Sequence, residues 1–138
     1  MKNDDLSNDL SEFLRKDPFM EYNHIQVDVV GTQCTRLHAD LVPESMNPHG
    51  ISHGGLLYTL ADCAAGITAR ADGRDYVTQN ASMNFLRNVR SGSVFAKSTL
   101  LKRGRRVVVV HVEILDQGGT LLADAVVNMM QVTVPPEK

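Results

Sequence analysis

Residues 56–71 read LLYTLADCAAGITARA, and this stretch decides the fold because it is the strongest helix signal in the chain. Leucine and alanine are good helix formers, and they dominate the stretch. Gly54 and Gly55 stand before it, and Gly73 follows it, where a glycine commonly ends a helix. The sequence therefore predicts one long, central and largely buried helix.

The segments on either side of this helix have the alternating pattern of β-strands. Residues 24–40 predict two strands broken at Gly31-Thr32, and residues 42–55 predict a loop because they contain prolines and glycines. Beyond the helix, glycine-containing turns separate four strand-like segments. These four segments are residues 76–88, 93–102, 106–116 and 121–134. In the first of them, alternation predicts one polar face formed by Thr78, Asn80, Ser82 and Asn84.

The order of these elements predicts the fold class. A short helix near residues 6–14, ending near Asp17-Pro18, precedes two strands, the long helix and four more strands. This order indicates an α+β fold in which the long helix covers one face of an antiparallel sheet. The other face and the sheet edges are left uncovered, which favours an oligomer. We divide the chain into a helical extension (1–22), one domain (23–134) and a flexible tail (135–138).

Composition excludes several classes of protein. The chain has 138 residues, 43% of them hydrophobic, and a formal net charge of −2, so it has no basic footprint for nucleic acid. No apolar run approaches the ~18 residues of a membrane span. The acidic N-terminus does not look like a secretory signal, and two cysteines do not form a disulfide framework. We therefore expect a cytoplasmic protein that binds neither membrane nor nucleic acid and needs no cofactor.

Asp62 is the only charged residue between Leu56 and Ala69. A carboxylate on a helix destined for burial is costly unless it is paired or protonated. Carboxylates in such surroundings occur often at functional sites. The alternative is that Asp62 points to solvent or accepts a structural hydrogen bond.

A glycine-rich loop, NPHGISHGG at residues 47–55, leads into the start of the long helix. Unpaired backbone N–H groups at a helix start can hold an anion or a developing oxyanion, although such a loop can also simply need unusual backbone angles. Gly54 and Asp62 are eight residues apart, or ~12 Å along one helix. One helix cannot easily bring both to one carbonyl group, so the spacing favours a site shared by two antiparallel helices of a dimer.

Other reactive residues give weaker signals. His49 and His53 are four residues apart, but they lie in a loop without a nearby Cys or acid, so we expect no metal site. Cys63 has no histidine placed to activate it, and the flanks of Ser52 do not spell the strand–Ser–helix elbow of serine hydrolases.

Two motifs carry a resemblance to a known family. Asn47-x-x-Gly50-x-x-His53-Gly54-Gly55, followed by Leu60-Ala61-Asp62, resembles hotdog-fold acyl-CoA thioesterases of the phenylacetic-acid-degradation type. The resemblance extends over residues 47–132, through Val77-Thr78, Asn84-Phe85-Leu86-Arg87, Gly92, Gly104-Arg105-Arg106, Val112-Glu113-Ile114 and Ala123.

The resemblance implies a hotdog fold, in which a sheet wraps the central helix and two subunits join their sheets, with a homotetramer as the expected assembly. It implies that Asp62 activates water or attacks the thioester directly, and that the Gly54 N–H polarises the carbonyl group. It further implies that Asn47 holds the thioester or the water, that Thr78 orients the nucleophile, and that His53 shapes the loop near the sulfur. The chain departs from the family at Gln79-Asn80, where Asp or Glu is frequent, and at Asn88, where Pro is frequent.

Basic residues are candidates for the phosphates of CoA because guanidinium groups suit phosphate oxygens. We select Arg103, Arg105 and Arg106, together with Gly55 of the loop, over Arg87, Arg90 and Lys102, while a solvated turn is the alternative for each. Two other functions stay open. One is a hotdog module that binds acyl-CoA without hydrolysing it, and the other is a hotdog dehydratase, whose paired Asp and His are not visible here.

Overall fold

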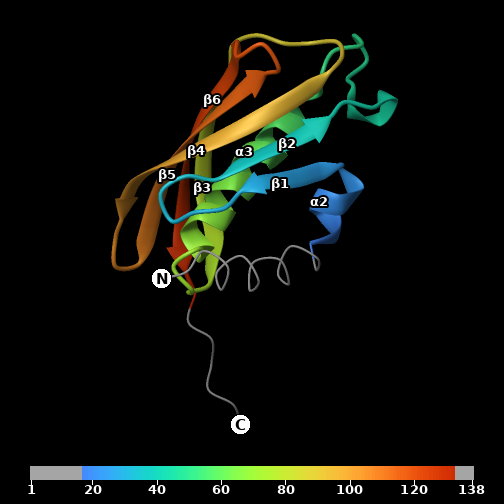
Figure 1. The fold of residues 1–138 in the computed structure, drawn as a ribbon. Helices are drawn as coiled ribbons and strands as arrows, with labels where there is room; N and C mark the ends of the chain where they lie inside the picture. Colours follow the sequence, from blue (N-terminus) through green and yellow to red (C-terminus); the bar gives the residue numbers. More distant parts are fainter. Residues whose placement is uncertain (1–16, 133–138) are drawn as a thin grey trace.

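The structure, a computed structural model, describes residues 17–132, so the helix predicted near residues 6–14 and the tail lie outside the described residues. One sheet and one long helix make up most of it (Figure 1). The elements are α2 (Pro18–Tyr22), β1 (Ile25–Val29), β2 (Arg36–Asp40), the 3-10 turn η1 (Pro43–Ser45), α3 (Gly54–Arg70), β3 (Tyr76–Phe85), β4 (Ser93–Arg103), β5 (Val107–Asp116) and β6 (Leu121–Gln131).

The six strands form one antiparallel sheet in the order β1-β2-β4-β5-β6-β3. The sheet curves around α3, which packs against its inner face (Figure 1). Strands β1 and β3 form the two edges, and β3 is ten residues long. The predicted α+β class is confirmed, and so is the order of the six strands and the long helix.

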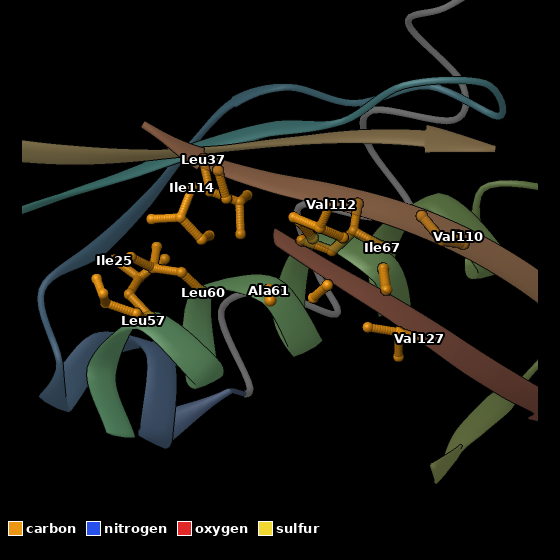
Figure 2. Close-up of a cluster of buried hydrophobic side chains, with 14 of the residues drawn as sticks. Ile25, Leu37, Leu57, Leu60, Ala61, Ile67, Val110, Val112, Ile114 and Val127 are labelled. Atoms are coloured by element: carbon orange, nitrogen blue, oxygen red, sulfur yellow. The ribbon is translucent and has the colours of Figure 1, made fainter. Parts of the chain in front are cut away.

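The core lies between α3 and the middle of the sheet. Figure 2 shows Leu57 and Leu60 of α3 on the side of Ile114 of β5. Ile67, further along α3, lies near Val112 and Val110 of the same strand (Figure 2). Strand β5 alternates between buried and half-buried side chains, as a strand with one covered face should. Each such Leu, Ile or Val adds about 1.5–3 kcal/mol when it leaves water. This layer fixes α3 and therefore the side chains that α3 presents at the sheet edge.

Helix α3 begins at Gly54, two residues before the predicted start, because His53 acts as its N-cap. The His53 side chain accepts a hydrogen bond from the Gly55 N–H, which sequence periodicity cannot indicate. At the other end, Gly73 adopts a positive φ of 88° two residues after the C-cap Ala71. The predicted helix is therefore confirmed, with a shift at its N-terminus.

Helix α2 begins where the sequence predicted a helix to end. The Asp17 side chain accepts a hydrogen bond from the Met20 N–H, and Pro18 occupies the first helical position. Proline is tolerated there because that N–H needs no partner within the helix. Met20 is buried, so this short helix is packed into the core.

Strand β3 changes face within its length. A β-bulge lies between Thr78, which pairs with Met129, and Asn80, which pairs with Asn128. Because a bulge inserts one extra residue, Thr78 reaches α3 whereas Asn80 pairs on the opposite face. The predicted single polar face from Thr78 to Asn84 is therefore wrong at Thr78.

Candidate functional site

Asp62 lies half-buried on α3, on the side that faces the edge strand β3. The Thr78 hydroxyl donates a hydrogen bond of 2.5 Å to Oδ1 of Asp62. This bond uses one carboxylate oxygen and fixes the orientation of the group, so Oδ2 can face a reactant. The structure thus brings together two of the predicted catalytic residues, from positions 16 apart in the sequence.

The loop before α3 leaves one backbone N–H at the helix start without a role in the fold. The Gly55 N–H donates to Nδ1 of His53 at 2.8 Å, and the Leu56 and Leu57 N–H groups both reach the His53 carbonyl oxygen. Among residues 17–132, no acceptor is assigned to the Gly54 N–H. Because Nδ1 accepts, the neutral His53 ring carries its hydrogen on Nε2, which points the donor away from the loop backbone.

Asn47 shapes the first part of the loop. Its Oδ1 accepts hydrogen bonds from the backbone N–H groups of His49, at 2.9 Å, and Ile51, at 3.3 Å. Its backbone N–H donates to the Ile51 carbonyl oxygen, and Gly50 supplies a positive φ of 74° for the tight turn. The carbonyl end of the Asn47 side chain is therefore structural, and the Nδ2 group is the end that can donate to a substrate.

The end of β3 and the residues that follow it pack against this loop. Ser52 is fully buried, and its hydroxyl donates a short hydrogen bond to Oδ1 of Asn88, which also accepts from the Val89 N–H. The Ser52 N–H donates to the Val89 carbonyl oxygen. At the helix start, a methyl group on Gly54 would lie 3.4 Å from the Phe85 ring. The residues just after β3 therefore set the position of the Gly54 N–H.

Arg103 has a structural task that the sequence did not reveal. Its guanidinium group donates to the carbonyl oxygens of Thr68, Ala69 and Thr32 and to the Asp72 carboxylate. The Thr68 and Ala69 carbonyl groups lie at the end of α3, where no further helical N–H is available, and Thr32 lies in the connection between β1 and β2. We selected Arg103 for phosphate, but all of these bonds are internal. Arg105 and Arg106, both exposed, lie in the adjoining turn, at the end of α3 opposite to Gly54.

The same cluster shifts the acidity of Asp72. Burial alone would raise the pKa of this carboxyl group, but hydrogen bonds from Tyr76 and Arg74 and the charge of Arg103 outweigh it, so the pKa is lowered. Burial and the hydrogen bond to Asp72 raise the pKa of Tyr76. This cluster is a charged anchor between α3 and the sheet.

The surroundings of Cys63 make it a poor candidate for a reactive group. Burial raises the pKa of the Cys63 thiol to about 12, with Asp17 and Asp62 adding to the effect, so Cys63 is a poor nucleophile. In the described part of the chain, no group of three or more His, Cys, Asp or Glu side chains could hold a metal ion. No helix within residues 17–132 is long and apolar enough to cross a membrane.

Sequence reasoning missed the contacts by which Ser52, Asn88 and Arg90 hold the loop. Arg90 donates to the His49 carbonyl oxygen at 3.2 Å, which places a guanidinium group beside the predicted substrate loop. The bond from Ser52 to Asn88 joins positions 36 apart, so no local pattern could indicate it. The departure from the family at Asn88 was visible, although its meaning was not.

Comparison with solved structures supports the fold. The chain is similar to the PaaI protein of the E. coli phenylacetic acid degradation operon, with a TM-score of 0.87 over 93% of this chain and 94% of that one, at 19% identity. It is also similar to a mutant of the phenylacetic acid degradation protein PaaI from Thermus thermophilus, with 26% identity, a TM-score of 0.79 and coverage of 84% and 100%. The fold is therefore the hotdog fold, as predicted.

Two further relatives bear on function. A Streptococcus mutans protein solved with bound acetyl-CoA is 25% identical, with a TM-score of 0.75 over 81% of this chain and 91% of that one. A candidate esterase of Saccharolobus solfataricus is 34% identical over 79 residues, which span only 56% of its length and 56% of this chain. The model of the thioesterase superfamily matches residues 49–123, more than half of the chain. The chain therefore belongs to the thioesterase superfamily.

Proposed function

We propose that this protein hydrolyses acyl-CoA thioesters to a free acid and CoA. Asp62 takes a proton from water as the water oxygen attacks the thioester carbonyl carbon. The Gly54 N–H donates to the oxyanion of the tetrahedral intermediate. The C–S bond then breaks, and the proton held by Asp62 passes to the departing thiolate. Direct attack by Asp62 on the carbonyl carbon is the alternative first step.

The bond between Thr78 and Asp62 is the observation that carries this proposal. A carboxylate held by one hydroxyl, on a helix of mostly Leu and Ala, is oriented for proton transfer through its second oxygen. A protein that only binds acyl-CoA would need no carboxylate there. His53 shapes the loop, and the Asn47 amide and the Gly55 segment contact the thioester arm of CoA.

We further propose that each active site is shared by two subunits. Gly54 and Asp62 both lie on α3, eight residues or ~12 Å apart, so one chain does not bring them to one carbonyl group. Asp62 lies below β3, an edge strand whose outer side has no partner strand among the described residues. A second copy joined at β3 would bring its own helix start towards Asp62. The homodimer is then the minimal unit, and a homotetramer would also cover the outer sheet face.

The substrate class draws support from the relatives. The Streptococcus mutans structure contains acetyl-CoA, and two PaaI neighbours belong to phenylacetic acid degradation. For the CoA phosphates we propose the exposed Arg105 and Arg106 of the partner, with Arg90 beside the loop as a local candidate. The two free thiols, Cys34 and Cys63, favour a cytoplasmic location.

The first test is thiol release from a panel of acyl-CoA thioesters. Asp62→Asn should lower turnover at least ~100-fold, because general base catalysis contributes 10²–10⁴. Asp28→Asn, an exposed aspartate at the opposite edge of the sheet, serves as the control and should keep wild-type turnover. Wild-type turnover in Asp62→Asn would exclude Asp62 as the base, and tight binding without any thiol release would favour a binding module.

A second test addresses the shared site. Gly54→Pro removes the backbone N–H at the first helical position, where proline is tolerated, whereas Gly54→Ala keeps it. Gly54→Pro and Asp62→Asn chains should each be inactive alone. Mixed at equal amounts, they should regain about a quarter of wild-type activity, because about half of the dimers carry one complete site. No recovery in verified mixed dimers would place both groups in one subunit.

A further inference from the structure

A cavity of about 130 Å³ opens beside Asp62. It lies between α3 on one side and α2, β3 and β6 on the other. Its lining runs along α3 from the candidate catalytic carboxylate towards the C-terminal end of the helix. The lining consists of Asp62, Cys63, Gly66, Ile67 and Arg70 of α3, Met20 and the adjoining Asp17, Thr78 of β3 and Met129 of β6.

The length of this cavity is limited by Arg70. A methyl group on Gly66 would lie 3.1 Å from Nη1 of Arg70, so the guanidinium group lies over Gly66. The Arg70 Nη2 donates to the Tyr76 carbonyl oxygen at 2.8 Å, which holds the group in place. Gly66 is one helical turn beyond Asp62, or ~6 Å along the axis. The space between the carboxylate and the guanidinium group is therefore short.

The walls between these two ends are mostly uncharged, with Asp17 as their one charged residue. Met20, Ile67 and Met129 are buried and apolar, and the Cys63 thiol is neutral because burial raises its pKa to about 12. The Asp17 carboxylate already accepts the Met20 N–H. Gly66 has no side chain, so it adds no bulk to the wall on the side of α3. Such walls suit an apolar group that enters from the side of Asp62.

We propose that this space, the acyl cavity, receives the acyl group of the substrate and restricts the enzyme to acyl groups of up to about six carbon atoms. A cavity of about 150 Å³ is known to hold benzene, a six-carbon molecule. The inference rests on the proposed thioester hydrolysis. It assigns acyl-length selection to Gly66 and to Met20, the buried residue of α2.

The test is a chain-length profile of kcat/KM for straight acyl-CoA thioesters from acetyl to dodecanoyl. For the wild type, octanoyl and longer groups should fall at least about tenfold below butanoyl, because one methylene group without space costs 10-fold or more. Gly66→Ala should lower kcat/KM for hexanoyl-CoA, relative to that for acetyl-CoA, by about tenfold. This variant should fold, because alanine is the better helix former and only the Arg70 side-chain end needs to move.

Met20→Ala widens the acyl cavity. It should raise kcat/KM for octanoyl-CoA, relative to that for acetyl-CoA, by about tenfold. The matched control is Met130→Ala, the same change on the opposite face of the sheet, which should keep the wild-type profile. A wild type that prefers dodecanoyl, or profiles that Gly66→Ala and Met20→Ala leave unchanged, would overturn the acyl cavity while thiol release still supported the proposed function. If no thioester released thiol, both proposals would fall together.

Discussion

One side-chain oxygen, Oδ1 of Asn88, holds the loop before α3 from outside. It accepts from the Ser52 hydroxyl and from the Val89 N–H. Since Ser52 is fully buried, its hydroxyl has no water to replace this acceptor. The loss of a buried partner costs about 1–3 kcal/mol, and a shift of the loop moves the Gly54 N–H with it. We therefore predict that Asn88 is a positioning residue for the proposed oxyanion donor.

Asn88→Ala should lower kcat about tenfold or more and leave KM nearly unchanged, because a misplaced oxyanion donor affects the transition state most. Asn88→Asp keeps an oxygen at the same place and should retain most of kcat. Steady-state kinetics on both variants, with thermal unfolding as a check of folding, measures this. Equal kcat in Asn88→Ala and wild type would show that the clamp has no part in turnover.

The residues of the site differ in how far the sequence could predict them. Asp62 stands out because its neighbours are apolar, and the family motif adds Thr78 and Gly54. The Ser52–Asn88 contact is invisible because serine and asparagine are common loop residues with many other roles. Arg103 was assigned to phosphate because a guanidinium group suits phosphate and carbonyl oxygens alike, and only the fold shows which oxygens lie near.

Among the elements, the C-terminal end of α3 depends on strand β4. Arg103 of β4 donates to two carbonyl groups of the last helical turn and to the Asp72 carboxylate just beyond it. Tyr76, the first residue of β3, donates to the same carboxylate at 2.6 Å. Two strands and one helix therefore meet at one charged cluster.

Arg103→Ala should lower the free energy of unfolding by about 2 kcal/mol or more, because hydrogen bonds from charged groups contribute about 1.5–3 kcal/mol. Arg105→Ala, in the exposed turn, should leave it nearly unchanged. Urea unfolding measures both. If Arg105→Ala lowered the free energy of unfolding as much as Arg103→Ala, the anchoring role of Arg103 would be contradicted.

The same measurement repeated against pH checks Asp72. Because its pKa is lowered in the folded state, Asp72 adds stability above the ordinary aspartate pKa near 4, and this is lost as pH falls through the lower folded value. Arg103→Ala should weaken this acid-dependent loss, since it removes one of the charges that lower the pKa.

The elements were predicted well and their details were not. Long periodic segments gave α3 and all six strands, because burial against one face imposes the period. The bulge in β3 was missed, since one extra residue at Gln79 leaves the composition of the strand unchanged. The sequence predicts a helix end at Asp17-Pro18, whereas α2 begins there, because both residue types occur near helix boundaries of either kind.

At the scale of the whole molecule, the candidate site lies at the margin of the subunit. Asp62 lies beside β3, which forms the edge of the sheet. The Gly54 N–H lies eight residues earlier, at the start of α3. If the site is shared as proposed, a single chain holds halves of two different sites. Catalysis should then require the assembled dimer.

Dilution tests this requirement. Activity per chain should stay constant at high concentration and fall once the chains separate, at the concentration where sedimentation shows the dimer dissociating. We expect activity to fall because each chain loses the oxyanion donor of its partner. The circular dichroism signal should stay constant, whereas unfolding would lower it. Activity per chain that stays constant through dissociation would show a complete site in each monomer.

The exposed edge of β3 has a consequence for the amount of enzyme in a cell. Where most chains are dimers, the total rate rises in proportion to the number of chains. Where most are monomers, active sites form only by encounter, so the rate rises with the square of that number. Halving synthesis would then leave a quarter of the activity. The strand edge at which we propose that two subunits join would make expression level a steep control on thioester turnover.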